Sequence, residues 1–151
     1  MTSFSRRLVA ETRLDTADLI WPLFVIEGQN MAEPIDAMPG VFRYSIDQLL
    51  QQAAKAVELT IPAIAIFPSI DAALRAASGS LPRDGDNLVC PAVSPVKPAF
   101  PHLGIILHVS LDPFTSHGPD ALLDGAEFLN AETIAVLSEP AVHQAHAGCD
   151  I

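Results

Sequence analysis

The densest run of polar side chains that could do chemistry lies in residues 107–120, which read LHVSLDPFTSHGPD. Asp112 and Asp120 carry carboxylate oxygens, the ligands that a hard cation such as Mg2+ takes in proteins. Ser110 adds a weak oxygen ligand to this candidate metal site. The alternative is that both aspartates cap turns, as Asp before Pro often does. The spacing alone favours the turn.

Histidines are the other candidate reactive groups in this run. His108 and His117 can titrate near neutral pH. His108 ends an apolar segment, which is typical of a core histidine with satisfied hydrogen bonds. Ser116, His117 and Asp120 have the residue types of a catalytic triad. The sequence has no Gly-x-Ser-x-Gly turn, and adjacent residues cannot face each other, so we reject a triad.

A second histidine pair, His143 and His146, lies near the carboxyl-terminal end of the sequence. Their spacing of three residues on a helix would allow both to bind one metal ion. No third ligand is evident, so a solvated helix face is the favoured interpretation. The sequence also contains no Walker loop and no GxGxxG motif for phosphate binding.

Composition excludes several classes of function. The 151 residues are 50% hydrophobic, with mean hydropathy +0.33 and a formal net charge of -10. This apolar content argues against disorder, and the acidic balance argues against nucleic acid or anionic lipid as a partner. No apolar run reaches the ~20 residues that a membrane-spanning helix needs. No secretory signal is visible, and Cys90 and Cys149 form no CxxC motif, so we expect a cytoplasmic protein with free thiols.

Hydrophobic patterning predicts an α/β protein. Short apolar runs at residues 20–26, 63–67 and 104–109 indicate buried parallel strands. A helix is predicted to start after Ser45, with Gln48 completing a capping box, and to end at residues 60–62. A second helix is expected from Asn130 to Gly148, with one apolar side. That side is made of Ile134, Leu137, Ala141 and Ala145.

The connecting segments carry their own predictions. Residues 27–41 and 69–86 are expected to be loops because they are rich in Gly, Pro, Asn and Asp. Residues 149–151 resemble the start of a further strand. Alternation of strands and helices places residues 107–120 at the carboxyl end of a parallel sheet, where α/β proteins form their active sites.

Residues 87–100 give contradictory signals. Their apolar residues have helical spacing, but Pro91, Pro95 and Pro98 lie among them, and Pro140 interrupts the later helix. A proline inside a helix costs about 3 kcal/mol or more. The pattern therefore predicts a helix, whereas the prolines predict that it is broken.

Several segments together resemble the porphobilinogen synthase family, also called the 5-aminolevulinate dehydratase family. The most specific are Met38-Pro39-Gly40-Val41 and the run LDPFTSHG at residues 111–118. The resemblance continues through residues 6–9, 19–28, 61–68, 87–89, 129–130 and 147–151. It is collinear along nearly the whole sequence.

The resemblance implies a (β/α)8 TIM barrel with an N-terminal arm, in subunits that assemble as homo-oligomers, commonly octamers. A complete barrel needs about 250 residues. We therefore expect an arm at residues 1–18 and, at 19–151, the first part of a barrel, about four βα units, incomplete at its carboxyl-terminal end. Such a partial barrel leaves strand edges and apolar faces uncovered, so we expect the isolated chain to be poorly folded or self-associated.

The family condenses two 5-aminolevulinate molecules to porphobilinogen, with loss of two waters, in haem and other tetrapyrrole biosynthesis. It uses Schiff bases on two lysines, which need a lowered pKa to be nucleophilic. Those lysines are expected beyond Ile151, because Lys55 and Lys97 match neither position. The resemblance thus assigns no catalytic residue to this chain and implies that it is inactive by itself.

The resemblance also bears on the metal. Zinc-dependent members carry three cysteines at the positions of Ser110, Asp112 and Asp120. Oxygen ligands do not select Zn2+ as thiolates do, so Mg2+ is the possible ion and Zn2+ is disfavoured.

Three features depart from the family pattern. His108 stands where the family has an aspartate, Pro119-Asp120-Ala121 replaces His-Asp-Gly, and prolines interrupt residues 87–100. Single G-to-C changes would explain the histidine and the prolines, which favours a sequence error or a decayed gene.

Two alternatives remain beside a synthase fragment. One is a non-catalytic truncated chain that binds full-length subunits and modulates their assembly. The weaker one is another βα-barrel enzyme.

Overall fold

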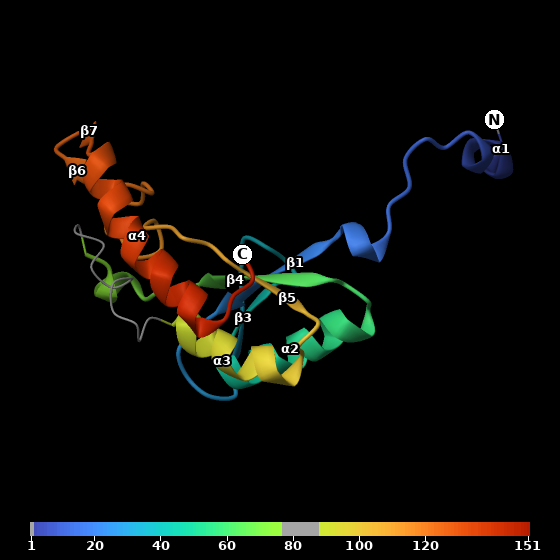
Figure 1. The fold of residues 1–151 in the computed structure, drawn as a ribbon, viewed down its shortest axis with the longest axis horizontal. Coiled ribbons are helices and arrows are strands. Elements are labelled where there is room, and N and C mark those ends of the chain that lie inside the picture. Colours follow the sequence, from blue (N-terminus) through green and yellow to red (C-terminus); the bar gives the residue numbers. More distant parts are fainter. Residues whose placement is uncertain (1, 77–87) are drawn as a thin grey trace.

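A mostly parallel sheet forms the body of this computed structural model, which describes residues 2–76 and 88–151 (Figure 1). The sheet order is β2-β3-β1-β4-β5, and only the β2–β3 pair is antiparallel. The strands are β1 (Ile20–Val25), β2 (Ala32–Pro34), β3 (Phe42–Tyr44), β4 (Ala63–Pro68) and β5 (Gly104–Leu107). The α/β class with a parallel sheet predicted from the sequence is confirmed.

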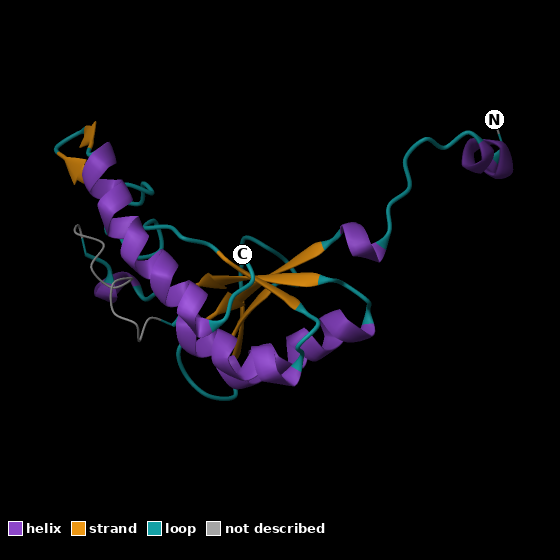
Figure 2. Cartoon of the chain, viewed as in Figure 1, coloured by secondary structure: helices purple, strands orange, loops and turns teal. Residues whose placement is uncertain are grey.

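Helices connect the parallel strands and pack along one face of the sheet (Figure 2). α2 packs on β1 and β4, while α3 packs on β4 and β5 and touches both α2 and α4. The helices are α1 (Ser3–Leu8), α2 (Ile46–Glu58), α3 (Val89–Ala99) and α4 (Asn130–Ala147). None of the helices in the described ranges is both long and apolar enough to cross a membrane.

The core lies between the sheet and these helices because alternate strand residues point to opposite faces. Val25, Ile64 and Ile105 are fully buried beneath α2 and α3. Burying each such side chain contributes roughly 1.5–3 kcal/mol to folding. The opposite face of the sheet is also apolar, with Phe24 and Phe67 half-buried on it.

Helix α2 begins as predicted, but the predicted capping box is wrong. The Ser45 hydroxyl makes no cap hydrogen bond; it accepts one from the Met31 N–H at 2.9 Å and donates to the Met31 carbonyl at 3.3 Å. Gln48 Nε2 donates instead to Asn30 Oδ1 at 2.8 Å. The start of α2 therefore ties down the loop that follows β1, because that loop offers both residues better-placed partners.

Gly28 allows the chain to turn sharply in that same loop. Its φ of +119° lies in the region that favours glycine, and a Cβ added there would clash with the Met31 sulfur. Gly40 also has a positive φ, +85°, but nothing would meet its Cβ within 4 Å.

Helix α3 forms in spite of its prolines, so of the two conflicting predictions the helical one is confirmed and the broken helix is wrong. Pro91 lies in the first turn, where the backbone N–H has no helical partner. Pro95 and Pro98 lie inside the helix but on its more exposed side, where water can bind the freed carbonyls. The opposite side buries Val93 and Val96 completely. Burial of that face offsets the two lost hydrogen bonds.

Helix α4 has the predicted bounds, but its buried side is not the predicted one. Thr133, Val136, Pro140 and Gln144 are buried. Ile134, expected on the buried side, is 58% exposed. The predicted side has the correct helical spacing. The side that packs is shifted by one residue, because it includes the polar side chains of Thr133 and Gln144.

The segment after α4 runs beside β5, as predicted for the start of a further strand. The Asp150 N–H donates to the Ile105 carbonyl at 2.8 Å, and the Leu107 N–H donates to the Ile151 carbonyl at 2.9 Å. Lys97 Nζ lies 2.5 Å from Asp150 Oδ1, and the Ile105 N–H donates to Oδ2 at 2.9 Å. The Asp150 carboxylate therefore ties α3 to the edge of β5.

Other segments add detail that patterning did not predict. Strand β2 lies within the expected loop at 27–41, and β6 (Leu123–Asp124) pairs with β7 (Glu127–Phe128) in a hairpin before α4. A short 3-10 turn, Ala72–Leu74, interrupts the expected loop at 69–86; the remainder of that loop, from residue 77, and Asn87 lie outside the described residues. Residues 2–15 extend away from the sheet (Figure 1).

Replacing Asp150 by Asn should lower the thermal stability of the chain. The charged hydrogen bond from Lys97 comes first among the causes that lower the pKa of Asp150 below its usual 3.8. The pair is partly exposed, so the loss should be about 1 kcal/mol or less at neutral pH. Because folding lowers this pKa, the contribution is complete above 3.8 and disappears as pH falls through the lower native value. Melting curves of both proteins across this range measure the difference, with Asp124→Asn as an exposed control.

Replacing Gly28 by Ala should destabilise the chain more than replacing Gly40 by Ala. Both substitutions place a side chain at positive φ, at a cost of about 1 kcal/mol. Only the Gly28 variant also requires the flexible Met31 side chain to move, so its additional loss of stability should be small. Equal losses in urea unfolding would show that the close approach of Met31 is not a constraint.

Candidate functional site

The candidate site lies at the carboxyl end of β5, where the loop at residues 108–120 begins. β5 ends at Leu107, two residues before the predicted end at Val109. His108 therefore leaves the sheet and is exposed, so the prediction of a satisfied core histidine is wrong. The carboxyl ends of β1 and β4 lie at the same edge, because both strands run parallel to β5.

Buried side chains anchor the loop to the body of the chain. Leu111 is fully buried, and Phe114 and Thr115 are nearly so. The N–H groups of Phe114 and Thr115 donate to the Leu111 carbonyl at 2.8 and 2.9 Å. Thr115 Oγ1 also donates to the Pro119 carbonyl at 3.2 Å. The loop is therefore held from within, while Asp112 and Asp120 remain on its surface.

The loop brings Asp112 and Asp120 together with His108. One ligand atom from each of these three exposed residues lies within 4.8 Å of the others. Asp120 Oδ1 also accepts the Leu111 N–H at 2.5 Å, which fixes that carboxylate beside the turn. Ser110, the weak third ligand expected from the sequence, is buried, with 4% of it exposed. Two carboxylates and an imidazole are donors that suit a divalent cation, so a metal fits the residues present.

Aromatic contacts position the His108 ring. Its centroid lies 5.8 Å from that of Phe67 at the end of β4, and the Phe67 centroid lies 5.7 Å from that of Phe24 on β1. Side chains from three neighbouring parallel strands or their ends thus form a row. A signal for His108 was present in the sequence: it immediately follows an apolar strand, as active-site residues of α/β proteins do.

The remaining histidines do not join this group. Both ring nitrogens of His117 are buried without a hydrogen-bond partner among the described residues, so no Ser116–His117 pair forms. This agrees with rejection of the triad. His143 is half-buried, and its Nδ1 is buried with no hydrogen-bond partner in the part of the chain that the structure describes, so the prediction of a solvated face is wrong for it. His146 is exposed, as expected.

Both lysines of the chain lie in the helix layer, away from the strand ends. Lys55 Nζ donates to Gln52 Oε1 on α2 at 3.1 Å, and Lys97 pairs with Asp150. Neither side chain lines the edge of the sheet at which His108 lies. Neither is placed to act there as a nucleophile.

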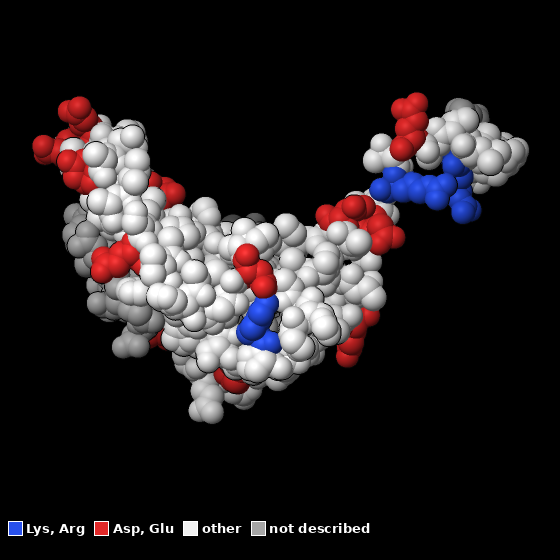
Figure 3. Space-filling model, in the orientation of Figure 1, with Lys and Arg blue, Asp and Glu red and all other residues white. Residues whose placement is uncertain are grey.

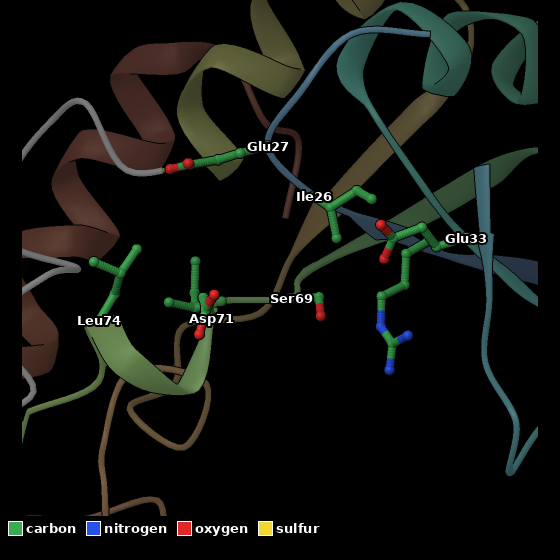
Figure 4. Close-up of a pocket in the computed structure, with 8 residues that line it drawn as sticks. Ile26, Glu27, Glu33, Ser69, Asp71 and Leu74 are labelled. Atoms are coloured by element: carbon green, nitrogen blue, oxygen red, sulfur yellow. The ribbon is translucent and has the colours of Figure 1, made fainter. Parts of the chain in front are cut away.

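A polar pocket of about 310 Å³ opens at the carboxyl ends of β1 and β4 (Figure 4). Glu27 follows β1, Ser69 and Asp71 follow β4, and Glu33 lies on β2. Arg43 of β3 is the cation among the lining residues. Sequence reasoning missed this pocket, although the signal was the same as for the β5 loop: polar residues directly after buried strands.

Charge is distributed unevenly over the visible face. Figure 3 shows Lys and Arg atoms next to Asp and Glu atoms on the N-terminal arm, and Asp and Glu atoms at the end that carries β6 and β7. The arm holds three of the eight basic residues, Arg6, Arg7 and Arg13.

Comparisons with known proteins place the chain in a family. A family model described as delta-aminolevulinic acid dehydratase matches residues 1–151. A protein of that name from Bradyrhizobium diazoefficiens is 52% identical over 148 residues, covering 98% of this chain and 42% of the relative. One from Chlamydia pneumoniae is 39% identical over 150 residues, covering 99% of this chain and 45% of the relative. The chain thus spans less than half the length of these relatives.

A solved structure gives the same result. The crystal structure of delta-aminolevulinic acid dehydratase (porphobilinogen synthase) from Toxoplasma gondii ME49, in complex with the reaction product porphobilinogen, matches with a TM-score of 0.91. Sequence identity is 32%, and the match covers 99% of this chain and 43% of that chain. The resemblance seen in the sequence is therefore confirmed. Since the family model matches all 151 residues, the chain belongs to the delta-aminolevulinic acid dehydratase family.

Proposed function

We propose that this chain supplies the amino-terminal part of a porphobilinogen synthase, a hydro-lyase that condenses two 5-aminolevulinate molecules with loss of two waters. The observation that carries this proposal is the family match along residues 1–151. A solved relative holds porphobilinogen, and 99% of this chain aligns with it. Tetrapyrrole and haem biosynthesis is the corresponding pathway.

The strand order supports a partial (β/α)8 barrel, about the first four βα units. β1, β4, β5 and the segment at 149–151 follow one another as parallel neighbours. Their connecting helices pack on one face, as in a barrel wall and unlike a doubly wound sheet (Figure 2). The half-buried apolar face that carries Phe24 and Phe67 would then face the barrel interior.

Catalysis requires the rest of the enzyme in this proposal. The Schiff-base lysines implied by the family lie beyond Ile151, and Lys55 and Lys97 occupy the helix layer. The role of this chain is to supply the strand ends and the β5 loop to the complete site. In the β5 loop, Asp112 and Asp120 would hold a divalent cation, and that cation would polarise substrate oxygen atoms. Carboxylates alone favour Mg2+ and disfavour Zn2+.

The exposed arm supports assembly with other subunits. Phe4, Leu8 and Leu14 are 66%, 79% and 81% exposed, and no residue of α1 is buried. Such apolar exposure marks a surface that binds another protein. It supports a homo-oligomer; from the family resemblance we propose an octamer in the cytoplasm. It equally favours the second candidate function, a non-catalytic chain that binds full-length subunits and modulates them.

The isolated chain should form no porphobilinogen from 5-aminolevulinate. A chimera in which residues 1–151 replace the matching part of the Bradyrhizobium relative should form it, because the chimera contains a complete barrel. The measurement is porphobilinogen release, with unmodified relative as the positive control. Turnover by the isolated chain would contradict the proposal that catalysis requires the rest of the enzyme. A folded chimera that stays inactive, even after His108→Asp, would contradict the proposed function.

Co-expression with a full-length synthase separates the two candidates. Native mass spectrometry should show only homo-oligomers of the synthase if the chain is simply part of the enzyme. Mixed oligomers, lost when residues 2–15 are deleted, would favour the modulating chain. Deletion of those residues leaves the core between the sheet and α2 intact.

A further inference from the structure

We propose that His108, Asp112 and Asp120 form a mixed nitrogen–oxygen site that prefers a first-row transition ion, such as Mn2+, Co2+ or Zn2+, over Mg2+. This goes beyond the carboxylate site proposed above, because it gives the ion a third ligand and a different identity. It rests on the metal-binding part of the proposed function and not on synthase activity.

The geometry of the three side chains fits one ion. Their ligand atoms lie within 4.8 Å of one another, and ligands about 2.0–2.2 Å from a common ion lie up to roughly 4.4 Å apart. All three residues are exposed, so small side-chain rotations suffice to close the remaining gap. Exposure also leaves room for water molecules to complete the coordination shell.

The surroundings hold each ligand near this position. One Asp120 oxygen, Oδ1, accepts the Leu111 N–H, and the other can bind the ion. Asp112 follows buried Leu111 directly, at the start of the turn closed by Phe114. The His108 ring lies against Phe67, which limits its rotation.

The donor set determines the preferred ion. Imidazole suits Zn2+, Co2+ and other transition ions, whereas Mg2+ selects oxygen ligands and keeps several waters. Affinity of such a site follows the Irving–Williams order, with Mn2+ below Co2+. Considering only cysteines and oxygens led the sequence argument towards Mg2+. The nitrogen of His108 changes that preference.

The test is titration of the metal-free chimera described above, which contains a complete barrel, with Mg2+, Mn2+ and Co2+ by calorimetry. Co2+ absorption reports nitrogen ligation and does not depend on enzyme activity. We expect Co2+ to bind more tightly than Mg2+ by about tenfold or more. His108→Ala should weaken Co2+ binding by about tenfold or more and change the absorption spectrum. His108→Asp should restore the preference for Mg2+.

Matched controls are His102→Ala and His146→Ala, which remove exposed histidines elsewhere. Neither should alter Co2+ binding. Equal Co2+ affinity in the chimera that carries His108 and in its His108→Ala variant would overturn the inference. Selective binding of Mg2+ by the chimera that carries His108, or no binding of any ion by it, would also overturn the inference. A chimera that makes porphobilinogen but shows one of these results refutes only this inference. A chimera that binds Co2+ through His108 but makes no porphobilinogen, even after His108→Asp, refutes only the proposed function.

Discussion

Parallel pairing of β1, β4 and β5 is the constraint on which the rest of the structure depends. Ile64 pairs with Trp21 on one side and Ile105 on the other, so all three strands end at one edge. Parallel strands need long crossover connections, and these become α2 and α3, which bury Val25, Ile66 and Val93 between them and the sheet. The same pairing places Glu27, Ser69 and His108 at that edge.

Much of this arrangement could be predicted from the sequence, because buried strands and amphipathic helices have strong periodicity. Details that depend on tertiary packing could not be predicted from the sequence. Helix α3 tolerates Pro95 and Pro98 because its opposite side is buried, and local propensity contains no information about that side. Likewise Ser45 has the expected type for a cap, but Met31, distant in sequence, offers it another partner.

In the candidate site too, some residues could be predicted from the sequence and others could not. Asp112 and Asp120 were identified from residue type and from their place after a strand, and the structure groups them. The apolar run at 104–109 predicts a strand to Val109 and therefore a core position for His108; the strand ends earlier, and the ring is exposed beside Phe67. His108, at the position where the resemblance implies an aspartate, thus carries a nitrogen donor in a chain whose family match covers residues 1–151.

The proposed ion-binding group depends on the end of β5 at Leu107 and on the loop that brings His108 to Asp112 and Asp120. Anomalous diffraction at the cobalt absorption edge, from crystals of the chimera grown with Co2+, tests this most directly. The account predicts one strong peak at coordination distance from a His108 ring nitrogen and from carboxylate oxygens of Asp112 and Asp120. A peak bound elsewhere, with the His108 ring turned away from the two aspartates, would contradict it.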